Sequence, residues 1–116
     1  MSASPFWVAC LCAQWCGVCR DWRAAFEEQA RAYPELNFAW VDVEDEADAM
    51  GDVDIETFPS LLVGRGDQAL FLGPVPPSGP GLARLVDTLR AQPGPGPGLS
   101  PDATALLRRL QDRVLR

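Results

Sequence analysis

FWVACLCAQWCGVC (residues 6–19) is the stretch that decides the fold, and it holds all four cysteines of the 116-residue chain. Its first six residues form a continuous apolar run without polar alternation, which is typical of a strand buried on both faces of a sheet. After the pair Cys16 and Cys19, apolar residues recur every three or four positions, which predicts an amphipathic helix over residues 17–33. Pro34 ends this helix. The sequence therefore places a Cys-x-x-Cys pair where a buried strand leads into a helix.

The pattern that follows completes a four-stranded sheet. Residues 37–43 (NFAWVDV) predict a second strand, which forms a right-handed βαβ unit with the first strand and the helix. Residues 60–63 and 69–72 predict two more strands, and the short turn at 65–68 joins them as an antiparallel hairpin. A helical stripe of leucine and valine then ends near Gln92.

The C-terminal part of the chain predicts a separate helix. A linker rich in proline and glycine at 93–99 divides a domain at 1–92 from an amphipathic helix at 100–116. Ser100 is a good N-cap, and proline follows it at the first helical position. The apolar stripe of this helix consists of Ala103, Leu106, Leu107, Leu110 and Val114. The tail carries four arginines and two aspartates, whereas the rest of the chain is strongly acidic. The helix therefore either docks on its own domain or binds a partner or a second copy.

Residues 42–56 form an acidic segment. This segment holds eight of the sixteen carboxylates and no basic residue, and its alanines and Met50 suggest a short surface helix. Such a run is usually a solvated face. The alternative is that it repels acidic partners or attracts basic ones.

Composition excludes several classes of function. The net charge is −6, and all ten basic residues are arginine, because the chain has neither lysine nor histidine. Ser-His-Asp triads, Cys-His nucleophiles, histidine metal ligands and lysine Schiff bases are therefore excluded. An acidic chain without basic clusters suits neither nucleic acid nor anionic membranes. No apolar run reaches the ~18 residues of a membrane span, so we expect neither kind of partner.

The four cysteines, Cys10, Cys12, Cys16 and Cys19, lie close together in the sequence. A secreted disulfide scaffold spreads its cysteines to join distant segments, so this cluster indicates a reactive or ligand-bearing site. The apolar segment 6–13 is short, and no positive residue precedes it, which argues against a signal peptide. We therefore expect a cytoplasmic protein whose thiols are reduced at rest.

The position of two cysteines at a helix start suits redox chemistry. Cys16 falls at the helix N-terminus, where unpaired N–H groups and the helix dipole stabilise an anion such as a thiolate. Cys19 lies one turn further on the same face and is more shielded. Thiol–disulfide exchange uses this division between an exposed nucleophile and a buried resolving thiol. Trp15 adds an apolar surface beside the two cysteines. The alternative to a redox pair is that Cys16 and Cys19 are structural thiols without redox chemistry.

These residues resemble the thioredoxin family. Residues 15–20 read WCGVCR, like the family's WCGPC followed by a basic residue. A second matching element, TFPS at 57–60, precedes a strand about forty residues after the cysteine pair. Gly73, after the last strand, is a third match. The resemblance covers about residues 6–92.

The resemblance implies an α/β fold of the thioredoxin-like class. We expect a four-stranded mixed sheet of order 2-1-3-4, flanked by helices, with the third strand antiparallel to the first two and a C-terminal helical extension. The resemblance also implies that Pro59 is cis and borders Cys16. Phe58 would offer backbone groups to an extended substrate, as in β-strand addition, and Gly73 would line the same groove. Trp15, Phe58, Pro59 and Gly73 are thus the candidate substrate-binding residues.

The sequence also departs from the family pattern. Because the resemblance begins at the family's central strand, we expect a minimal form without the family's opening strand and helix. Val18 stands where the family has proline between the cysteines. Cys10 occupies the position of a buried acid that accepts the proton of the resolving thiol, and Trp40 occupies that of a flanking lysine. These exchanges predict a drier site behind Cys19. Cys10 either packs as a small apolar residue or takes part as an auxiliary thiol, and Cys12 could approach the active pair from the side.

The leading functional hypothesis is a protein-disulfide oxidoreductase. Cys16 would attack a substrate disulfide, and Cys19 would release the reduced product. We expect a monomer that uses no cofactor and is reduced by a flavoprotein resembling thioredoxin reductase or by glutathione. One alternative is a binding or adaptor module that keeps the fold without turnover. The other is a zinc or iron–sulfur site, although the C-x-C-x₃-C-x₂-C spacing argues against a metal.

Overall fold

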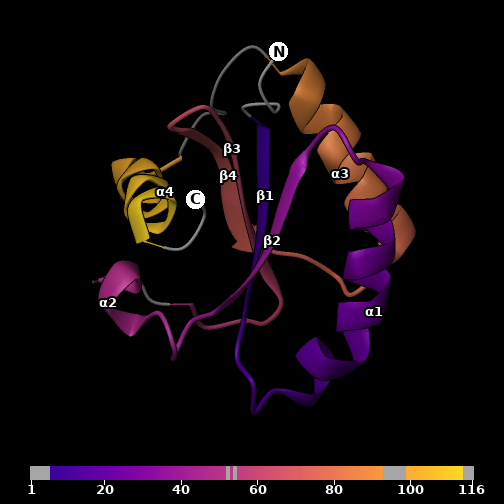
Figure 1. Ribbon diagram of the computed structural model, residues 1–116, viewed down its shortest axis with the longest axis horizontal. Helices are drawn as coiled ribbons and strands as arrows, with labels where there is room; N and C mark the ends of the chain where they lie inside the picture. Colours follow the sequence, from indigo (N-terminus) through magenta and orange to yellow (C-terminus); the bar gives the residue numbers. More distant parts are fainter. Residues whose placement is uncertain (1–5, 52, 54, 93–98, 114–116) are drawn as a thin grey trace.

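The computed structural model describes residues 6–51, 53, 55–92 and 99–113. A single four-stranded sheet lies between two helical layers (Figure 1). The elements in chain order are β1 (Phe6–Cys12), α1 (Gly17–Ala32), β2 (Asn37–Asp42), α2 (Ala47–Met50), β3 (Ser60–Arg65), β4 (Gln68–Pro74), α3 (Gly79–Ala91) and α4 (Pro101–Arg113).

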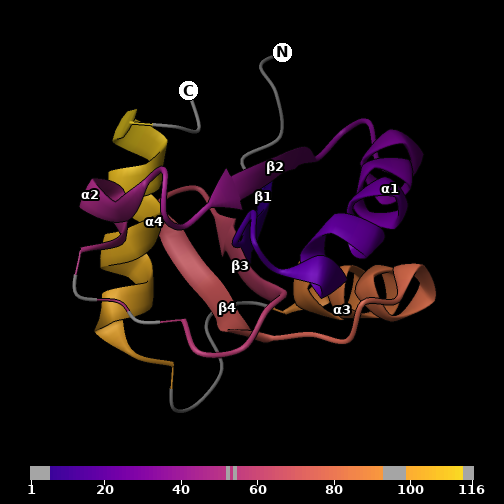
Figure 2. The same ribbon diagram turned by 90° about the horizontal axis from the view of Figure 1, so that it is seen from below.

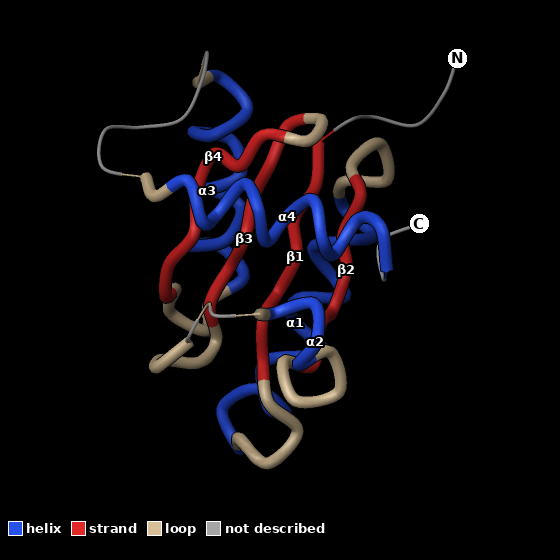
Figure 3. Tube along the Cα trace, turned by 90° about the vertical axis from the view of Figure 1, so that its left-hand side faces the viewer, coloured by secondary structure: helices blue, strands red, loops and turns tan. Residues whose placement is uncertain are grey.

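The strand order β2-β1-β3-β4 confirms the predicted topology (Figure 3). β1 pairs in parallel with β2 and antiparallel with β3, and β4 closes an antiparallel hairpin with β3. β1 is therefore a central strand, which explains its continuous apolar sequence. Because β3 runs against β1, the last residues of β1 lie opposite Ser60, and Ser60 in turn lies opposite Pro74. The end of β1 and the residues around Pro59 thus meet at one end of the sheet.

The two faces of the sheet carry different helices. α1 and α3 cover one face, whereas α4 and the short α2 lie on the other (Figures 1 and 2). Side chains alternate along β1, so Cys10 and Cys12 belong to the cluster under α1, while Ala9 and Leu11 belong to the cluster under α4. This alternation puts the two strand cysteines on the same face as the helix that carries the other two. Among the described residues, no helix is both long and apolar enough to cross a membrane.

The C-terminal helix α4 packs on its own domain. Its buried side chains join the second core cluster, and they are Ala103, Leu106, Leu107 and Leu110. Arg109 donates hydrogen bonds of 2.6 and 3.1 Å to the carbonyls of Ala49 and Met50, which end α2. The tail therefore docks on the acidic segment through main-chain carbonyls and apolar contacts. Residues 93–98 of the predicted linker and Val114 lie outside the described residues.

The acidic segment is less fully solvated than the sequence predicts. α2 forms where a short surface helix is expected, but Ala49 and Met50 are buried against α4. The acidic Asp45 and Asp48 remain exposed. The segment is partly buried because even this short helix is amphipathic and packs its apolar residues against α4.

Several element ends also differ from the predicted ones. The hairpin turn is tighter, because Gly66 adopts a positive φ of 62° and lets β3 and β4 extend almost to each other. α3 begins earlier than its apolar stripe, at Gly79, because the hydroxyl of Ser78 accepts a 3.1 Å hydrogen bond from the Gly81 N–H.

Candidate active site

The candidate site lies where β1 leads into α1. The N–H of Cys16 donates to the carbonyl of Ala13 at 3.0 Å, which turns the chain, and Cys16 is the N-cap residue of α1. Cys16 is partly exposed, whereas the side chain of Cys19 is buried with 1% of its surface exposed. The exposure of the two cysteines thus follows the predicted division between an accessible and a shielded thiol.

The disulfide in this structure joins Cys12 to Cys19, and the thiols of Cys10 and Cys16 are free. Cys12 is the last residue of β1 and points to the α1 face, so the first turn of α1 lies over it at a Cα–Cα distance of 5.9 Å. The expected Cys16–Cys19 pairing is therefore not the one observed. The sequence suggested that Cys12 could approach the Cys16 and Cys19 pair from the side. In the structure Cys12 is bonded to Cys19. The catalytic roles of Cys16 and Cys19 stay predictions.

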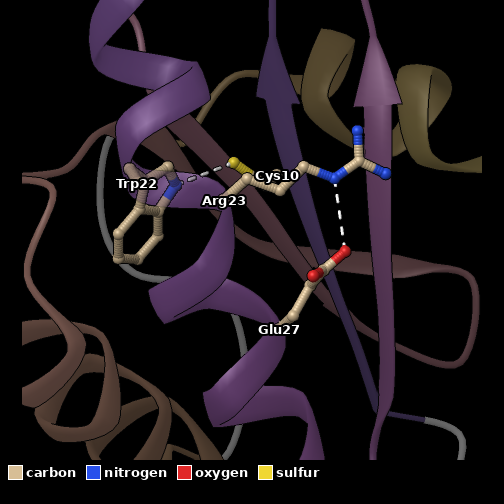
Figure 4. Close-up of polar contacts among 4 residues, drawn as sticks. All are labelled: Cys10, Trp22, Arg23 and Glu27. Carbon is tan, nitrogen blue, oxygen red and sulfur yellow. Dashed lines mark hydrogen bonds and ion pairs between the residues drawn. The ribbon is translucent and has the colours of Figure 1, made fainter.

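Cys10 is a fully buried, neutral thiol. The indole Nε1 of Trp22 donates to its Sγ at 3.4 Å (Figure 4). The Cys10 Sγ also lies 3.6 Å from the Sγ of Cys12. Burial raises the pKa of Cys10 to about 12, although the Trp22 hydrogen bond partly opposes this rise. At neutral pH the thiol keeps its proton and cannot replace the family's carboxylate as a base. This supports the interpretation of Cys10 as a packing residue.

A cavity of about 350 Å³ opens beside Cys19. Its lining residues are Ala13, Gln14, Cys19, Arg20, Arg23, Trp40, Asp42, Asp45 and Glu46. The guanidinium of Arg23 lies 4.9 Å from the centre of the Trp40 ring. Arg23 also pairs with Glu27 at 3.3 Å (Figure 4). Behind Cys19, the Cys10 and Trp22 side chains lie in a buried apolar cluster against which Trp40 packs, as predicted, whereas this opening beside Cys19 is lined by charged side chains.

Trp15 and Phe58 come together at the same end of the sheet. The Trp15 side chain is 62% exposed, and its ring meets that of Phe58 edge-on at 5.7 Å between centroids. The peptide bond between Phe58 and Pro59 is cis, as the resemblance implied, and the Pro59 carbonyl accepts a hydrogen bond from Val75 at 3.1 Å. The tryptophan beside the cysteines thus contacts the proline loop directly.

Gly73 lines a second depression of about 260 Å³. The residues around it are Val53, Ile55, Glu56, Thr57, Ser60, Leu72, Gly73 and Pro74. Thr57 and Ser60 flank the Phe58–Pro59 pair. Gly73 therefore lies beside the proline loop, and its place in a groove shared with Cys16 stays a prediction.

Sequence reasoning missed the part that Asp42 plays. Its carboxylate accepts N–H hydrogen bonds of 2.9 to 3.0 Å from Gln14, Glu44 and Asp45. Asp42 thereby ties the loop before Cys16 to the loop after β2, and Glu44 in turn accepts a 2.9 Å bond from the Trp15 indole. The signal for it was an aspartate at a strand end, where its side chain bonds the next N–H groups.

The described residues contain no group of three or more histidine, cysteine or acidic side chains placed to hold a metal ion. The two sulfurs of Cys12 and Cys19 are bonded to one another.

Curated proteins with similar sequences include thioredoxins. Thioredoxin H4-2 of Oryza sativa subsp. japonica is 38% identical over 55 residues, which are 47% of this chain and 42% of that protein. The curated relatives are matched over less than half of their length.

Solved structures share the fold. The thioredoxin of Fasciola hepatica superposes with a TM-score of 0.57 at 27% identity, covering 76% of this chain and 81% of that one. A chain of the complex of ferredoxin:thioredoxin reductase with thioredoxin f2 gives a TM-score of 0.67 at 16% identity, over 77% and 81% of the two chains. The sequence model of the family described as Thioredoxin matches residues 2–74, well over half of the chain, and this protein therefore belongs to the thioredoxin family.

Proposed function

We propose that this chain is a thiol–disulfide oxidoreductase that acts on protein disulfides. The observation that carries the proposal is a free, partly exposed Cys16 thiol at the start of α1, one helical turn before a Cys19 whose sulfur is already in a disulfide. An accessible thiol beside a sulfur that forms disulfides is the arrangement that exchange chemistry requires. Membership of the thioredoxin family supports the same reaction class.

The proposed cycle starts from the fully reduced protein. The Cys16 thiolate attacks one sulfur of a substrate disulfide, which forms a mixed disulfide and releases the first substrate thiolate. The Cys19 thiolate then attacks the Cys16 sulfur, releases the second substrate thiolate and leaves a Cys16–Cys19 disulfide. Two electrons pass from the protein to the substrate. The N-terminus of α1 favours the negative charge that develops at Cys16.

The surface beside Cys16 suits a protein substrate. The exposed Trp15 ring and the Phe58 ring form an apolar patch next to the cysteines. We propose that an extended substrate segment lies on this patch and bonds backbone groups near Phe58 and Pro59, as an added β-strand does. Gly73, beside the proline loop, leaves room for that segment.

A reductant must restore the dithiol after each turnover. One structural neighbour was solved in complex with ferredoxin:thioredoxin reductase, and this supports a reductase as partner. For this chain we propose a flavoprotein resembling thioredoxin reductase, with glutathione as the alternative. We further propose that the protein works in the cytoplasm as a monomer and without a cofactor.

The test is reduction of insulin by dithiothreitol, with the purified protein as catalyst. Wild type should accelerate the reaction, Cys16→Ser should abolish the acceleration, and Cys19→Ser should accumulate a mixed disulfide with the substrate. Cys10→Ala is the matched control, because it removes a buried thiol of the same cluster. An unchanged rate in Cys16→Ser would overturn the proposal.

A binding module without turnover is the second candidate. The observed Cys12–Cys19 disulfide favours it, because this bond leaves Cys16 without its resolving thiol. The same assay separates the two functions. A binding module would form a lasting mixed disulfide through Cys16 in the wild type and release no reduced product.

A further inference from the structure

We propose that Cys12 is a third redox-active cysteine. Cys12 and Cys16 replace one another as the disulfide partner of Cys19. The oxidised protein would then exist as two isomers. One has a Cys12–Cys19 disulfide and a free Cys16 thiol, and the other has a Cys16–Cys19 disulfide and a free Cys12 thiol. This inference rests on the proposed function, since it assumes that Cys16 and Cys19 form a disulfide during turnover.

Cys19 lies within bonding reach of both partners. The disulfide to Cys12 is present in the structure, with the Cα atoms 5.9 Å apart. Cys16 precedes Cys19 by three residues at the start of α1, and side chains at this spacing lie next to each other on a helix. All three side chains contact the same core cluster. Cys19 is therefore the shared disulfide partner, and either Cys12 or Cys16 can be bonded to it.

The exchange needs no outside oxidant or reductant. The Cys16 thiolate attacks the Cys19 sulfur, the Cys16–Cys19 bond forms, and the Cys12–Cys19 bond breaks. Cys12 leaves as a thiolate and takes up the proton that Cys16 gave to the solvent. The reverse step starts with attack by the Cys12 thiolate on the same sulfur. The number of disulfides and the oxidation state of the protein stay the same throughout.

Exposure gives the two isomers different properties. Cys12 and Cys19 are each 1% exposed, so an external thiol cannot reach the Cys12–Cys19 bond directly. Cys16 is partly exposed and is the accessible sulfur of the three. Electrons therefore enter the buried disulfide through Cys16, after the exchange has moved the bond to the surface. In the buried isomer, Cys16 stays a free nucleophile but lacks its resolving thiol, so a mixed disulfide formed there persists until the reductant arrives.

Cys10 does not take part in this exchange. Its sulfur lies 3.6 Å from that of Cys12, but the two residues are two positions apart on one strand, where a disulfide would be strained. Cys10 thus serves as a matched control, since it lies on the same strand and the same face as Cys12.

The sequence makes the two isomers easy to separate. Chymotrypsin cuts after Trp15 and Trp22, which puts Cys12 and Cys19 on different peptides and puts Cys16 with Cys19 on one peptide, 16–22. The oxidised wild type is unfolded at acidic pH, which stops thiol–disulfide exchange and exposes both free thiols, and is then treated with N-ethylmaleimide, digested and analysed by mass spectrometry. We expect both products, namely peptide 16–22 linked to a peptide that carries Cys12, and peptide 16–22 with an internal disulfide.

A kinetic experiment tests the route of reduction. In Cys16→Ser the Cys12–Cys19 disulfide should be reduced by dithiothreitol at least ten times more slowly than in wild type, whereas Cys10→Ala should match wild type. Equal rates in Cys16→Ser and wild type would overturn the inference, and so would a single isomer in the peptide map. The outcome is distinct from failure of the proposed function. A wild type that reduces insulin but shows one isomer overturns only the exchange, and one that shows both isomers but reduces nothing overturns only the oxidoreductase.

Discussion

The indole Nε1 of Trp22 donates a 3.4 Å hydrogen bond to the Sγ of Cys10, in the centre of the sheet face that α1 covers (Figure 4). Thioredoxins, by the resemblance described above, keep an acid at this position. Here the core instead holds a thiol whose pKa burial raises to about 12. The position has thus changed from one that exchanges protons to one that keeps its proton.

This neutral thiol predicts a pH dependence of stability. Between the ordinary thiol pKa of about 8.5 and about 12, the unfolded chain loses the Cys10 proton while the folded chain keeps it. The free energy of unfolding therefore falls as pH rises through this window, by up to about 1.4 kcal/mol per pH unit. Urea denaturation of wild type and Cys10→Ala, both kept reduced, should show the extra slope in wild type alone. Equal slopes between about pH 9 and about pH 11 would contradict the raised pKa.

Trp15 should contribute to substrate binding and not to stability. Its ring is 62% exposed and contacts Phe58, so Trp15→Ala removes an apolar surface of the proposed site but almost nothing of the core. We expect kcat/KM for insulin to fall about fivefold, equivalent to about 1 kcal/mol for a lost aromatic contact, mainly through KM. Trp15→Phe should keep most of the activity. A small aromatic disulfide reagent, which needs no extended binding surface, is the control substrate, and an equal loss with it would argue against a binding role.

Gly64 permits the close approach of α4 to the sheet. A Cβ at this position would overlap Cδ2 of Leu107 and lie 3.0 Å from the Gln68 carbonyl. Gly64→Ala should therefore lower the free energy of unfolding by about 1–3 kcal/mol through overpacking. Leu107→Ala should cost about 2–5 kcal/mol by leaving a cavity.

The double variant tests whether these two residues interact. Because truncation of Leu107 makes room for the new methyl group, Gly64→Ala with Leu107→Ala should cost less than the sum of the two single variants. Gly17→Ala is the control, since the nearest atom to its Cβ position is 3.7 Å away. Strict additivity in urea denaturation would show that Leu107 does not set the cost at Gly64.

The sheet could be predicted from the sequence because a strand as apolar as β1 is stable only when both of its faces are buried. The apolar run in β1 requires cover on both faces, and the cysteine pair and proline loop then identify the topology. The disulfide could not be predicted in the same way. Cys12 and Cys16 are both near Cys19 in the sequence, and which sulfur meets it depends on how the first turn of α1 crosses the end of β1.

The placement of α4 shows the same limit. Its leucine stripe predicts an amphipathic helix, but a stripe says only that the face is buried and not against what. The partner is decided by the shape of the sheet at Gly64 and by the carbonyls of Ala49 and Met50, which accept from Arg109. Hydrogen bonds to main-chain carbonyls cannot be read from the amino-acid composition. The opposite charges of the tail and the domain therefore suggested docking, but they did not identify these contacts.

The acidic residues near the cysteines should select substrates by charge. Asp45 and Glu46 line the cavity beside Cys19, so a disulfide peptide flanked by arginine should react up to about tenfold faster at low salt than the same peptide flanked by glutamate. The ratio should fall toward one at high salt, because the screening length shrinks to about 3 Å at 1 M. Neutralising both residues with Asp45→Asn and Glu46→Gln should lower the low-salt ratio. Asp67→Asn, in the hairpin turn at the opposite end of the sheet, should leave it unchanged. A ratio that does not depend on salt, or that falls equally in Asp67→Asn, would mean that local charge does not select the substrate.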